Sequence, residues 1–435
     1  MNFNKTVIYQ LFLRVFTPEG TLKAASEMLE HIKELGADIV YLCPVCEADD
    51  DMNEAFWSDR QKKSGLNNPK NPYRIKDYFK IDEEYGNEDD LKSFINKAHS
   101  LGLKVLLDLV YFHCGPKAKL LEMEPEMIVR EADGTPENGE WHFPRLNFES
   151  EKLREYMYSN MEYFVKEFGN DGYRIDIGDY VTLDFWVEGI KRLKKINPDI
   201  IMLNEGDKSE YVKNGFDLNY NTNWAHALPD VFAGDEPATK IKDTWLEYQS
   251  KDNLLGLRSF ETHDITNNAY DNRMEKIIGS QGAEAVLTLN FAIDGTPMLY
   301  NGNEVCDTTR HSIYSNRFYG KNFVINWRNA LTEQGKKRIA FIKKLIFMKK
   351  NIPALSEGNV TWIDTECNDK LLVFIRSTEN ETLLIAVNTT KDYVNVKLND
   401  FVPESVLLSS NAVYNGEKKP ELSLGEFGYI IIECK

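Results

Sequence analysis

Long hydrophobic runs are absent from this sequence of 435 residues. A membrane-crossing helix needs about 18 or more consecutive apolar residues, whereas the longest apolar stretches, such as Val105–Val110, are short and contain an aspartate. Basic residues are scarce as well: 52 Lys and Arg stand against 69 Asp and Glu, so the formal net charge is −17. Binding nucleic acid requires a concentrated basic face. We therefore expect neither a membrane nor a nucleic-acid partner.

Cysteine, glycine and proline are each too dilute to define the fold. The six cysteines do not form the dense framework of a small disulfide-stabilised domain. Cys43 and Cys46 have the spacing of a redox or zinc motif, but no second such pair occurs, so we expect reduced, partly buried thiols. The 26 glycines and 15 prolines are scattered, and 42% of the residues are hydrophobic, which excludes fibrous and disordered chains. Since the N-terminus has no leader-like apolar segment, we predict a cytoplasmic protein.

Short apolar runs alternate with longer amphipathic stretches through most of the chain, which is typical of repeated strand–helix units. The expected strands are residues 7–16, 37–43, 103–110, 172–177, 199–203, 215–219, 254–260 and 296–300. Helices are expected at 22–35, 89–101, 151–168, 182–196, 238–249, 276–291 and 333–349. Eight strands in this order predict a (β/α)8 TIM barrel. The alternative is a doubly wound open sheet, but its usual glycine-rich turn after the first strand has no counterpart at residues 16–20.

The pattern changes after residue 351. Residues 360–363, 371–376, 382–388 and 429–433 are short strand-like runs with turn residues and no helix between them. This pattern predicts a C-terminal antiparallel β-sandwich domain at 352–435, following a barrel domain at 1–351. The segment from residue 44 to about 87 is polar and is expected to be a long loop.

Acidic side chains stand at the ends of several predicted strands. The carboxyl ends of barrel strands meet at one face, so Asp176, Glu205 and Asp264 are expected to converge there. An acid in a strand costs several kcal/mol of desolvation unless it is paired. One such acid is explained by a structural ion pair, for example Asp176 with Arg174. Three that converge on one barrel mouth indicate a functional site.

Glycoside hydrolysis is the chemistry that uses such a set. Two carboxyl groups about 5 Å apart act as nucleophile and as acid/base in a retaining mechanism. One must be ionised and the other protonated, so their surroundings must differ. Arg174 lies two residues before Asp176, on the same face of the strand, and is expected to keep Asp176 ionised. Glu205 has no basic neighbour in the sequence before Lys208, which is compatible with a raised pKa.

Several segments resemble the α-amylase family of retaining glycoside hydrolases (glycoside hydrolase family 13). Residues 108–113, Asp-Leu-Val-Tyr-Phe-His, are similar to that family's first signature, Asp-Val-Val-x-Asn-His. Residues 172–176, Gly-Tyr-Arg-Ile-Asp, are similar to its second, Gly-Phe-Arg-x-Asp. Glu205 stands where the third signature has its glutamate, and His263-Asp264 where the fourth ends. Residues 71–78 and 295–304 resemble the family's Gly-Tyr-Asp-x-x-Asp-Tyr loop and its eighth-strand motif.

The resemblance implies a role for each of these residues. Asp176 would be the nucleophile, Glu205 the general acid/base, and Asp264 the third carboxylate, which binds and distorts the sugar. The other substrate-binding residues would be His113 and His263 on sugar hydroxyls, Arg174 on Asp176, and Tyr73 stacked on the sugar face. Asp108 would be a structural acid near the site, and a small insertion would occupy about residues 111–146. The implied partner is an oligosaccharide substrate.

The sequence also departs from the family pattern. Phe112 replaces an asparagine that often helps to bind calcium, so we predict no metal and no cofactor. Asp49–Asp51 with Asn53 are an alternative calcium site, although a solvated acidic loop is the preferred interpretation. Thr262 and Gly206-Asp207 also differ from the usual residues. Ile177 stands where a valine accompanies α-1,6 activity in the family, a hint towards branched substrates.

The leading hypothesis is a retaining hydrolase of α-glucosidic bonds in malto- or isomalto-oligosaccharides. It would act by double displacement through a covalent glycosyl-enzyme on Asp176. A transglycosylase or a sugar isomerase with the same site is one alternative. A non-catalytic carbohydrate-binding protein on the same fold is another, and a metal-dependent barrel enzyme is a third. The sequence makes no prediction of the oligomeric state.

Overall fold

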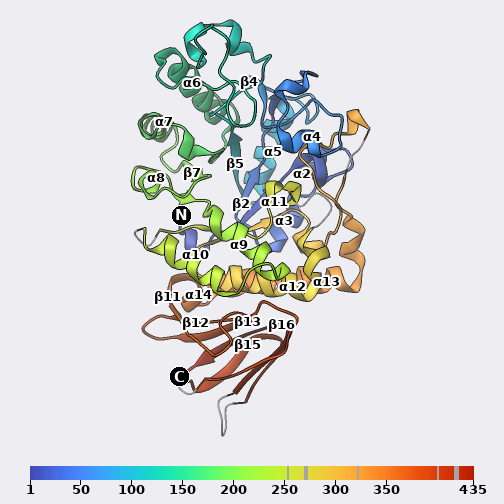
Figure 1. Ribbon diagram of the computed structural model, residues 1–435, viewed down its shortest axis with the longest axis vertical. Coiled ribbons are helices and arrows are strands. Elements are labelled where there is room, and N and C mark those ends of the chain that lie inside the picture. The colour runs from blue at the N-terminus through green and yellow to red at the C-terminus, as the bar shows by residue number, and fades with distance from the viewer. Residues whose placement is uncertain (252–253, 269–272, 321–322, 399–400, 416–420) are drawn as a thin grey trace.

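The computed structural model describes residues 1–251, 254–268, 273–320, 323–398, 401–415 and 421–435. Eight parallel strands form one sheet in the order β8-β7-β6-β5-β2-β1-β10-β9. They are β1 Ile8–Leu11, β2 Ile39–Leu42, β5 Lys104–Leu109, β6 Gly172–Ile175, β7 Ile201–Asn204, β8 Leu218–Asn219, β9 Leu257–Arg258 and β10 Thr296–Tyr300. An isolated parallel bridge from Asn219 to Gly256 joins the two ends of this sheet into a ring. The predicted (β/α)8 TIM barrel is therefore confirmed (Figure 1).

Helices follow the strands and surround the barrel (Figure 1). The longer ones are α3 Leu29–Leu35, α5 Glu88–Ser100, α6 Glu151–Phe168, α7 Leu183–Ile196, α9 Thr222–Ala233, α10 Thr239–Gln249, α12 Met274–Ala292 and α13 Glu333–Asn351. The short ones are α1 Leu13–Phe16, α2 Leu22–Ser26, α4 Asp59–Lys63, α8 Ser209–Lys213, α11 His263–Asn268 and α14 Pro353–Glu357. The bounds of α6 are those predicted, because its ends carry clear signals. Ser150 caps the first turn, and Gly169 ends the helix in a left-handed conformation.

Two elements near the N-terminus differ from the prediction. The first strand ends at Leu11 rather than residue 16, because the Phe12 N–H donates to the Asn301 side chain and the chain then turns into α1. In α1, the buried Arg14 pairs with Glu84 at 2.8 Å. The helix expected at 22–35 is divided into α2 and α3.

The segment between β2 and α5, predicted as a loop, contains two strands, the α-helix α4 and a 3-10 turn at Glu54–Phe56. Strands β3 Cys46–Ala48 and β4 Ile75–Ile81 form a small antiparallel sheet. Helix α4 lies between them and is capped by Ser58, whose side chain accepts a hydrogen bond from the Gln61 N–H. This segment stands over the barrel mouth and carries several of the residues that line the pocket described below.

The insertion expected at about residues 111–146 follows β5. It contains the 3-10 turns Lys119–Glu122 and Pro125–Met127 and is held by isolated antiparallel bridges, including His113 with Arg145 and Ile128 with Leu146. These bridges return the chain to the barrel, so that Trp141 and Phe143 line the pocket.

Six antiparallel strands form the C-terminal β-sandwich, as predicted. They are β11 Asn359–Trp362, β12 Leu371–Ser377, β13 Thr382–Asn388, β14 Val394–Lys397, β15 Pro403–Asn415 and β16 Glu421–Cys434. Strand β16 pairs with β14 through its first half and with β13 through its second half, so one long strand belongs to both layers. Side chains from both halves, such as Leu422 and Ile432, share one buried cluster with β12 and β13. The exact division of the chain at residue 351 remains a prediction.

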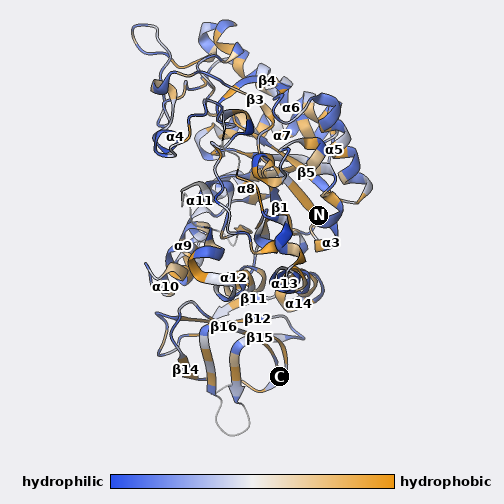
Figure 2. Ribbon diagram, turned by 90° about the vertical axis from the view of Figure 1, so that its right-hand side faces the viewer, coloured by the Kyte–Doolittle hydropathy of each residue, from blue (hydrophilic) through white to orange (hydrophobic). Residues whose placement is uncertain are grey.

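The other face of β12, β13 and β16 belongs to the main core. Phe374, Ile385 and Ile431 are buried in the same apolar cluster as the barrel. Both ribbon views place these strands beneath α12, α13 and α14 (Figures 1 and 2). Arg376 of β12 donates to the carbonyl oxygen of Ala292 at the end of α12, at 2.8 Å. Among the described residues, no helix is long and apolar enough to cross a membrane.

Candidate active site

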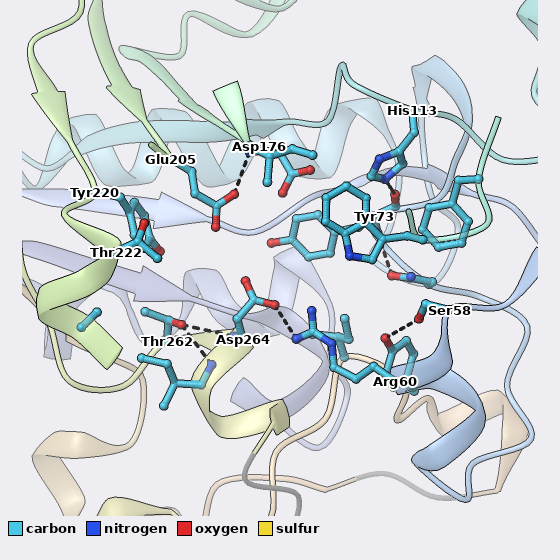
Figure 3. Close-up of a pocket in the computed structure, with 18 of the residues that line it drawn as sticks. Ser58, Arg60, Tyr73, His113, Asp176, Glu205, Tyr220, Thr222, Thr262 and Asp264 are labelled. Carbon is cyan, nitrogen blue, oxygen red and sulfur yellow. Dashed lines mark hydrogen bonds and ion pairs between the residues drawn. The ribbon is translucent and has the colours of Figure 1, made fainter. Parts of the chain in front are cut away.

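A pocket of about 950 Å³, counting the open space at its mouth, lies at the carboxyl ends of the barrel strands. Five of the seven predicted site residues line it: Tyr73, His113, Asp176, Glu205 and Asp264. The three carboxylates approach it from different loops, and Figure 3 shows Asp176 and Glu205 across the pocket from Asp264. The expected convergence of the three carboxylates is therefore observed.

Arg174 and His263, the other two predicted residues, lie behind the pocket wall. The Arg174 guanidinium is fully buried. Its Nη1 lies 2.8 Å from Asp108 Oδ1 and 3.0 Å from Asp176 Oδ1, and its Nη2 lies 2.7 Å from Glu205 Oε2. The sequence prediction assigned Arg174 to Asp176 alone, but the structure shows that one guanidinium holds both carboxylates of the pair. Burying an unpaired charge is costly, so this shared cation makes the buried pair tolerable.

Asp176 and Glu205 share protons as a pair. Burial raises the pKa of Asp176 well above its usual range, since Arg174 offsets only part of this effect and Glu205 adds to it. Burial also raises the pKa of Glu205, again against the influence of Arg174. Two interacting groups with raised pKa values titrate together. The pair is therefore able to keep one proton under conditions that ionise ordinary carboxyl groups.

Where Glu205 carries that proton, its contacts select the oxygen that holds it. Its Oε2 faces Arg174 Nη2 and accepts a hydrogen bond of 2.7 Å from the Ile177 backbone N–H. Both contacts favour negative charge on Oε2, so a proton on Glu205 belongs on Oε1. Ile177 supplies this N–H from a left-handed conformation, with φ of 38°, which is uncommon for a β-branched residue.

Two cations contact Asp264. Arg60 of α4 lies 2.8 Å from Oδ1, and His263 Nε2 lies 3.0 Å from Oδ2. Burial alone would raise the pKa of Asp264, but His263 and Arg60 outweigh it and hold the pKa well below its usual range. Asp264 thus remains ionised while the other two carboxyls share a proton. His263 is fixed in turn by Gln10, whose Nε2 lies 2.7 Å from His263 Nδ1.

Tyr73 and His113 form a connected wall of the pocket. His113 Nε2 lies 2.8 Å from the carbonyl oxygen of Tyr73, and burial lowers the pKa of His113 to about 4, so the imidazole is neutral. The Tyr73 hydroxyl donates to Asp108 Oδ2 at 2.9 Å, and its ring stacks on that of His263 with centroids 5.0 Å apart. Asp108 also accepts from Tyr41 and Arg174. We interpret Asp108 as a structural acid, as the sequence suggested.

Other pocket residues were not predicted from the sequence. They are Ser58, Arg60, Asn71, Trp141, Phe143, Ile177, Tyr220, Thr222, Ala225, His226, Thr262, Ile265, Ile313 and Tyr314. Most of them belong to segments without periodic apolar residues, where sequence alone contains no signal of proximity. Phe143 lies in the insertion that the family resemblance had located, and Thr262 in its fourth signature. Figure 3 shows Arg60 pointing from α4 towards Asp264.

In the acidic loop that was expected to be solvated, Asn53 is exposed and Asp50 and Asp51 are partly exposed, but Asp49 is not. Asp49 is fully buried and accepts hydrogen bonds from the backbone N–H groups of Asp51 and Lys117, with Arg74 Nη2 3.5 Å away. These donors occupy the carboxylate from several sides. Over the described part of the chain, no group of three or more His, Cys, Asp or Glu residues is arranged to hold a metal ion.

Comparison with known sequences gives the geometry its context. Residues 3–128 and 138–345 match the family described as "Alpha amylase, catalytic domain". The chain belongs to the α-amylase family of glycoside hydrolases. Residues 363–431 match a second description, "Maltogenic Amylase, C-terminal domain", which covers most of the β-sandwich.

Individual relatives of this α-amylase family member are distant. A cyclomaltodextrinase from a Bacillus species is 25% identical over 86% of this chain and 66% of its own length. A maltogenic alpha-amylase from Bacillus acidopullulyticus is 24% identical over 87% and 64%, respectively. The chain thus spans about two thirds of the length of these curated relatives. The crystal structure of an alpha-amylase from Lactobacillus plantarum superposes with a TM-score of 0.80 over 99% of both chains at 24% identity, which shows a shared fold.

Proposed function

We propose that this protein is a retaining glycoside hydrolase that cleaves α-glucosidic bonds in malto- or isomalto-oligosaccharides. One observation carries the proposal: Asp176 and Glu205 are held on one guanidinium at the wall of an open pocket, with an ionised Asp264 opposite. The match to a maltogenic amylase C-terminal domain and the relative named cyclomaltodextrinase favour maltose-based substrates.

In the first step, Asp176 attacks the anomeric carbon of the sugar. Its Oδ1 is held by Arg174, which leaves Oδ2 for the attack. The bond from the anomeric carbon to the leaving oxygen breaks, and Glu205 Oε1 transfers its proton to that oxygen. The result is a glycosyl ester on Asp176 and an ionised Glu205.

In the second step, water hydrolyses this ester. Glu205, now a carboxylate, removes a proton from the water as its oxygen attacks the anomeric carbon. The bond to Asp176 breaks, and both residues return to their starting protonation states. Arg174 contacts both groups throughout, so it stabilises whichever of them carries the negative charge.

Further side chains would hold the sugar. His113 donates through Nε2 to the Tyr73 carbonyl oxygen, so its neutral imidazole would accept a hydrogen bond from a sugar hydroxyl at Nδ1. Tyr73 would stack on the sugar face, and Asp264, held from behind by His263, would bind neighbouring hydroxyls. The ionised Asp264 also stabilises the positive charge of the oxocarbenium-like transition state. We retain the cytoplasm as the proposed location, because all six cysteines are free thiols.

A substrate panel tests this proposal. Wild type and Asp176→Asn are assayed on maltotriose, isomaltose, a cyclic maltodextrin, sucrose, trehalose and an aryl α-glucoside, with the exposed Asp199→Asn as the matched control. Wild type and Asp199→Asn are expected to hydrolyse at least one maltose-based substrate, and Asp176→Asn none. If wild type hydrolyses none of these substrates, the proposed hydrolase activity is wrong. If Asp176→Asn stays active, the mechanism is wrong.

Product analysis separates hydrolysis from its alternatives. A retaining hydrolase releases an α-anomeric product first, whereas a transglycosylase produces longer oligosaccharides and an isomerase leaves the chain length unchanged. A 5-fluoro-α-glucosyl fluoride is expected to add one glycosyl mass to the peptide that contains Asp176. A label on any other peptide would contradict the assignment of the nucleophile.

A further inference from the structure

The loop after β7 follows Glu205 with Gly206, Asp207 and Lys208, where the sequence departs from the family signature. This loop packs against the loop after β6, which follows the proposed nucleophile. Two backbone contacts join the loops: the Ile177 N–H donates to Glu205 Oε2, and the Gly178 N–H donates to the Glu205 carbonyl oxygen at 3.1 Å. The place of the Glu205 carboxyl therefore depends on how these two loops fit together.

Asp179 makes the largest share of the remaining contacts between the loops. Its Oδ1 accepts from the Asn204 side chain at 2.8 Å, and its Oδ2 accepts from the backbone N–H groups of Asp207 and Lys208 at 2.9 and 3.2 Å. Its carbonyl oxygen accepts from Lys208 Nζ at 3.0 Å. Asp179 thus binds the chain on both sides of Glu205, and these side-chain hydrogen bonds go to residues 204, 207 and 208 rather than to Glu205 or Asp176.

The glycines in these loops make the approach possible. A Cβ at Gly206 would overlap the Asp179 carboxylate, and a Cβ at Gly178 would overlap the Asn204 side chain. Gly206 therefore leaves room for the Asp179 carboxylate, and Gly178 leaves room for the Asn204 amide. The same Asn204 Nδ2 also donates to Asn219 Oδ1 at 3.0 Å, which connects the arrangement to β8.

We propose that Asp179 is a positioning residue for Glu205, and that its carboxylate fixes the point from which Glu205 delivers its proton to the leaving oxygen. This inference rests on the proposed function. Three directional hydrogen bonds from residues 204, 207 and 208 leave Glu205 little freedom to move. A displacement of about 1 Å in a proton donor is enough to cost about 100-fold in rate.

The test compares two substrates whose leaving groups differ in their need for a proton. It thereby separates proton delivery by Glu205 from substrate binding and nucleophilic attack. Maltotriose has a poor leaving group that must be protonated as its bond breaks, whereas α-glucosyl fluoride releases fluoride without needing a general acid. The value of kcat/KM is measured for both substrates, because it reports on the first step alone. The variants are Asp179→Asn, which keeps the size but turns one acceptor into a donor, and Gly206→Ala, which displaces the carboxylate. The exposed Asp184→Asn, in the same segment, is the control.

For Asp179→Asn we expect kcat/KM on maltotriose to fall about 100-fold, while kcat/KM on the fluoride stays close to that of wild type. Gly206→Ala is expected to show the same pattern, and Asp184→Asn neither effect. The alkaline limit of the maltotriose profile should also move for Asp179→Asn, because the pKa of a displaced Glu205 changes. Azide, which needs no general base, is expected to restore part of kcat on the fluoride.

Equal losses on both substrates would overturn the proposal, because they would show a general effect on the fold of the site. Unchanged kinetics in Asp179→Asn and Gly206→Ala would overturn it as well. Should Asp179→Asn fail to fold, Gly206→Ala answers the question through the same comparison. If wild type turns over neither maltotriose nor the fluoride, the proposed function itself fails, and this inference with it.

Discussion

At the scale of single residues, the three carboxylates differ in the cations that contact them. Asp264 is contacted by Arg60 and His263, whereas Asp176 and Glu205 share Arg174. The carboxyl contacted by two cations has a lowered pKa, and the two that share one have raised pKa values. This difference is what an acid/base mechanism needs, since one proton must be available near two ionised groups.

Arg60 is expected to set the acid limit of activity. Replacing it by glutamine removes a cation that lowers the pKa of Asp264, so that pKa should rise. Because activity requires ionised Asp264, the acid limb of kcat/KM against pH is expected to move to higher pH. The exposed Lys62→Gln on the same helix is the control. An acid limb that stays in place in Arg60→Gln would show that Arg60 does not act through Asp264.

His311 is expected to make stability depend on pH. Burial, with the nearby Arg273, lowers its pKa to about 4 from 6.5, so between these values the unfolded chain binds a proton that the folded chain does not. Stability must then rise with pH across this window and fall on acidification, by about 1.4 kcal/mol per pH unit for one proton. Urea unfolding is measured from pH 4 to 7. The free energy of unfolding of His311→Gln should rise with pH less steeply than that of wild type, by up to this amount per pH unit. An unchanged slope would contradict the assignment.

Sequence reasoning located the residues on strand ends but not those on the segments above them. Strand ends are predictable because the barrel brings them together, whatever the loops do. Arg60 contacts Asp264 from a polar segment 204 residues away in the chain, with no periodic pattern that predicts a helix there. Such contacts depend on the path of a long connection, which is a tertiary property.

At the scale of helices and strands, the bounds were predicted correctly where the ends of an element have clear sequence signals. The helix Glu151–Phe168 and the strands Thr296–Tyr300 and Thr382–Asn388 have the predicted bounds, because capping residues, turn residues and apolar runs agree there. The strands β14 and β15 were missed, since the exposed residues of β15 interrupt its apolar pattern. Short barrel strands such as Leu257–Arg258 were predicted too long, because burial continues beyond the paired residues.

The capping box of α5 gives a test at this scale. The Asn87 side chain accepts from the Asp90 N–H at 3.0 Å, and the Asp90 side chain accepts in return from the Asn87 N–H. Asn87→Ala is expected to lower the free energy of unfolding by about 1 kcal/mol. Asn96→Ala makes the same chemical change at an exposed position inside α5 and is expected to leave stability unchanged or raise it. Chemical denaturation of both variants measures the difference, and equal stabilities would contradict the capping role.

The barrel and the β-sandwich share one apolar core at the scale of the whole molecule. Phe427, at the bend of β16, is 1% exposed and packs against Phe232 of α9 with ring centroids 6.1 Å apart. The Phe427 carbonyl oxygen also accepts from the Gln281 side chain of α12. The sandwich therefore supports two of the helices that surround the barrel.

Phe427→Ala is expected to destabilise the whole chain. Removing a buried phenylalanine lowers the free energy of unfolding by about 3–5 kcal/mol. Because Phe427 packs between the sandwich and the barrel, both parts lose contacts. Val413→Ala, at a position that is 57% exposed on the outer face of the sandwich, is the control and should change stability little. Thermal unfolding is the measurement. A Phe427→Ala variant with the midpoint of wild type would show that the two parts do not depend on one another.

The pairing of the first strand with the last has a consequence for synthesis. Ile8 of β1 lies opposite Met298 of β10, about 290 residues later in the chain. At about 5–20 residues per second, the ribosome needs roughly 15–60 seconds to reach β10 after it has made β1. Throughout that time the edge of β1 that will pair with β10 has no partner. The strand is only four residues long, which keeps this open edge short. Asp264 emerges between β9 and β10, so the nascent chain acquires its third carboxylate just before its barrel closes.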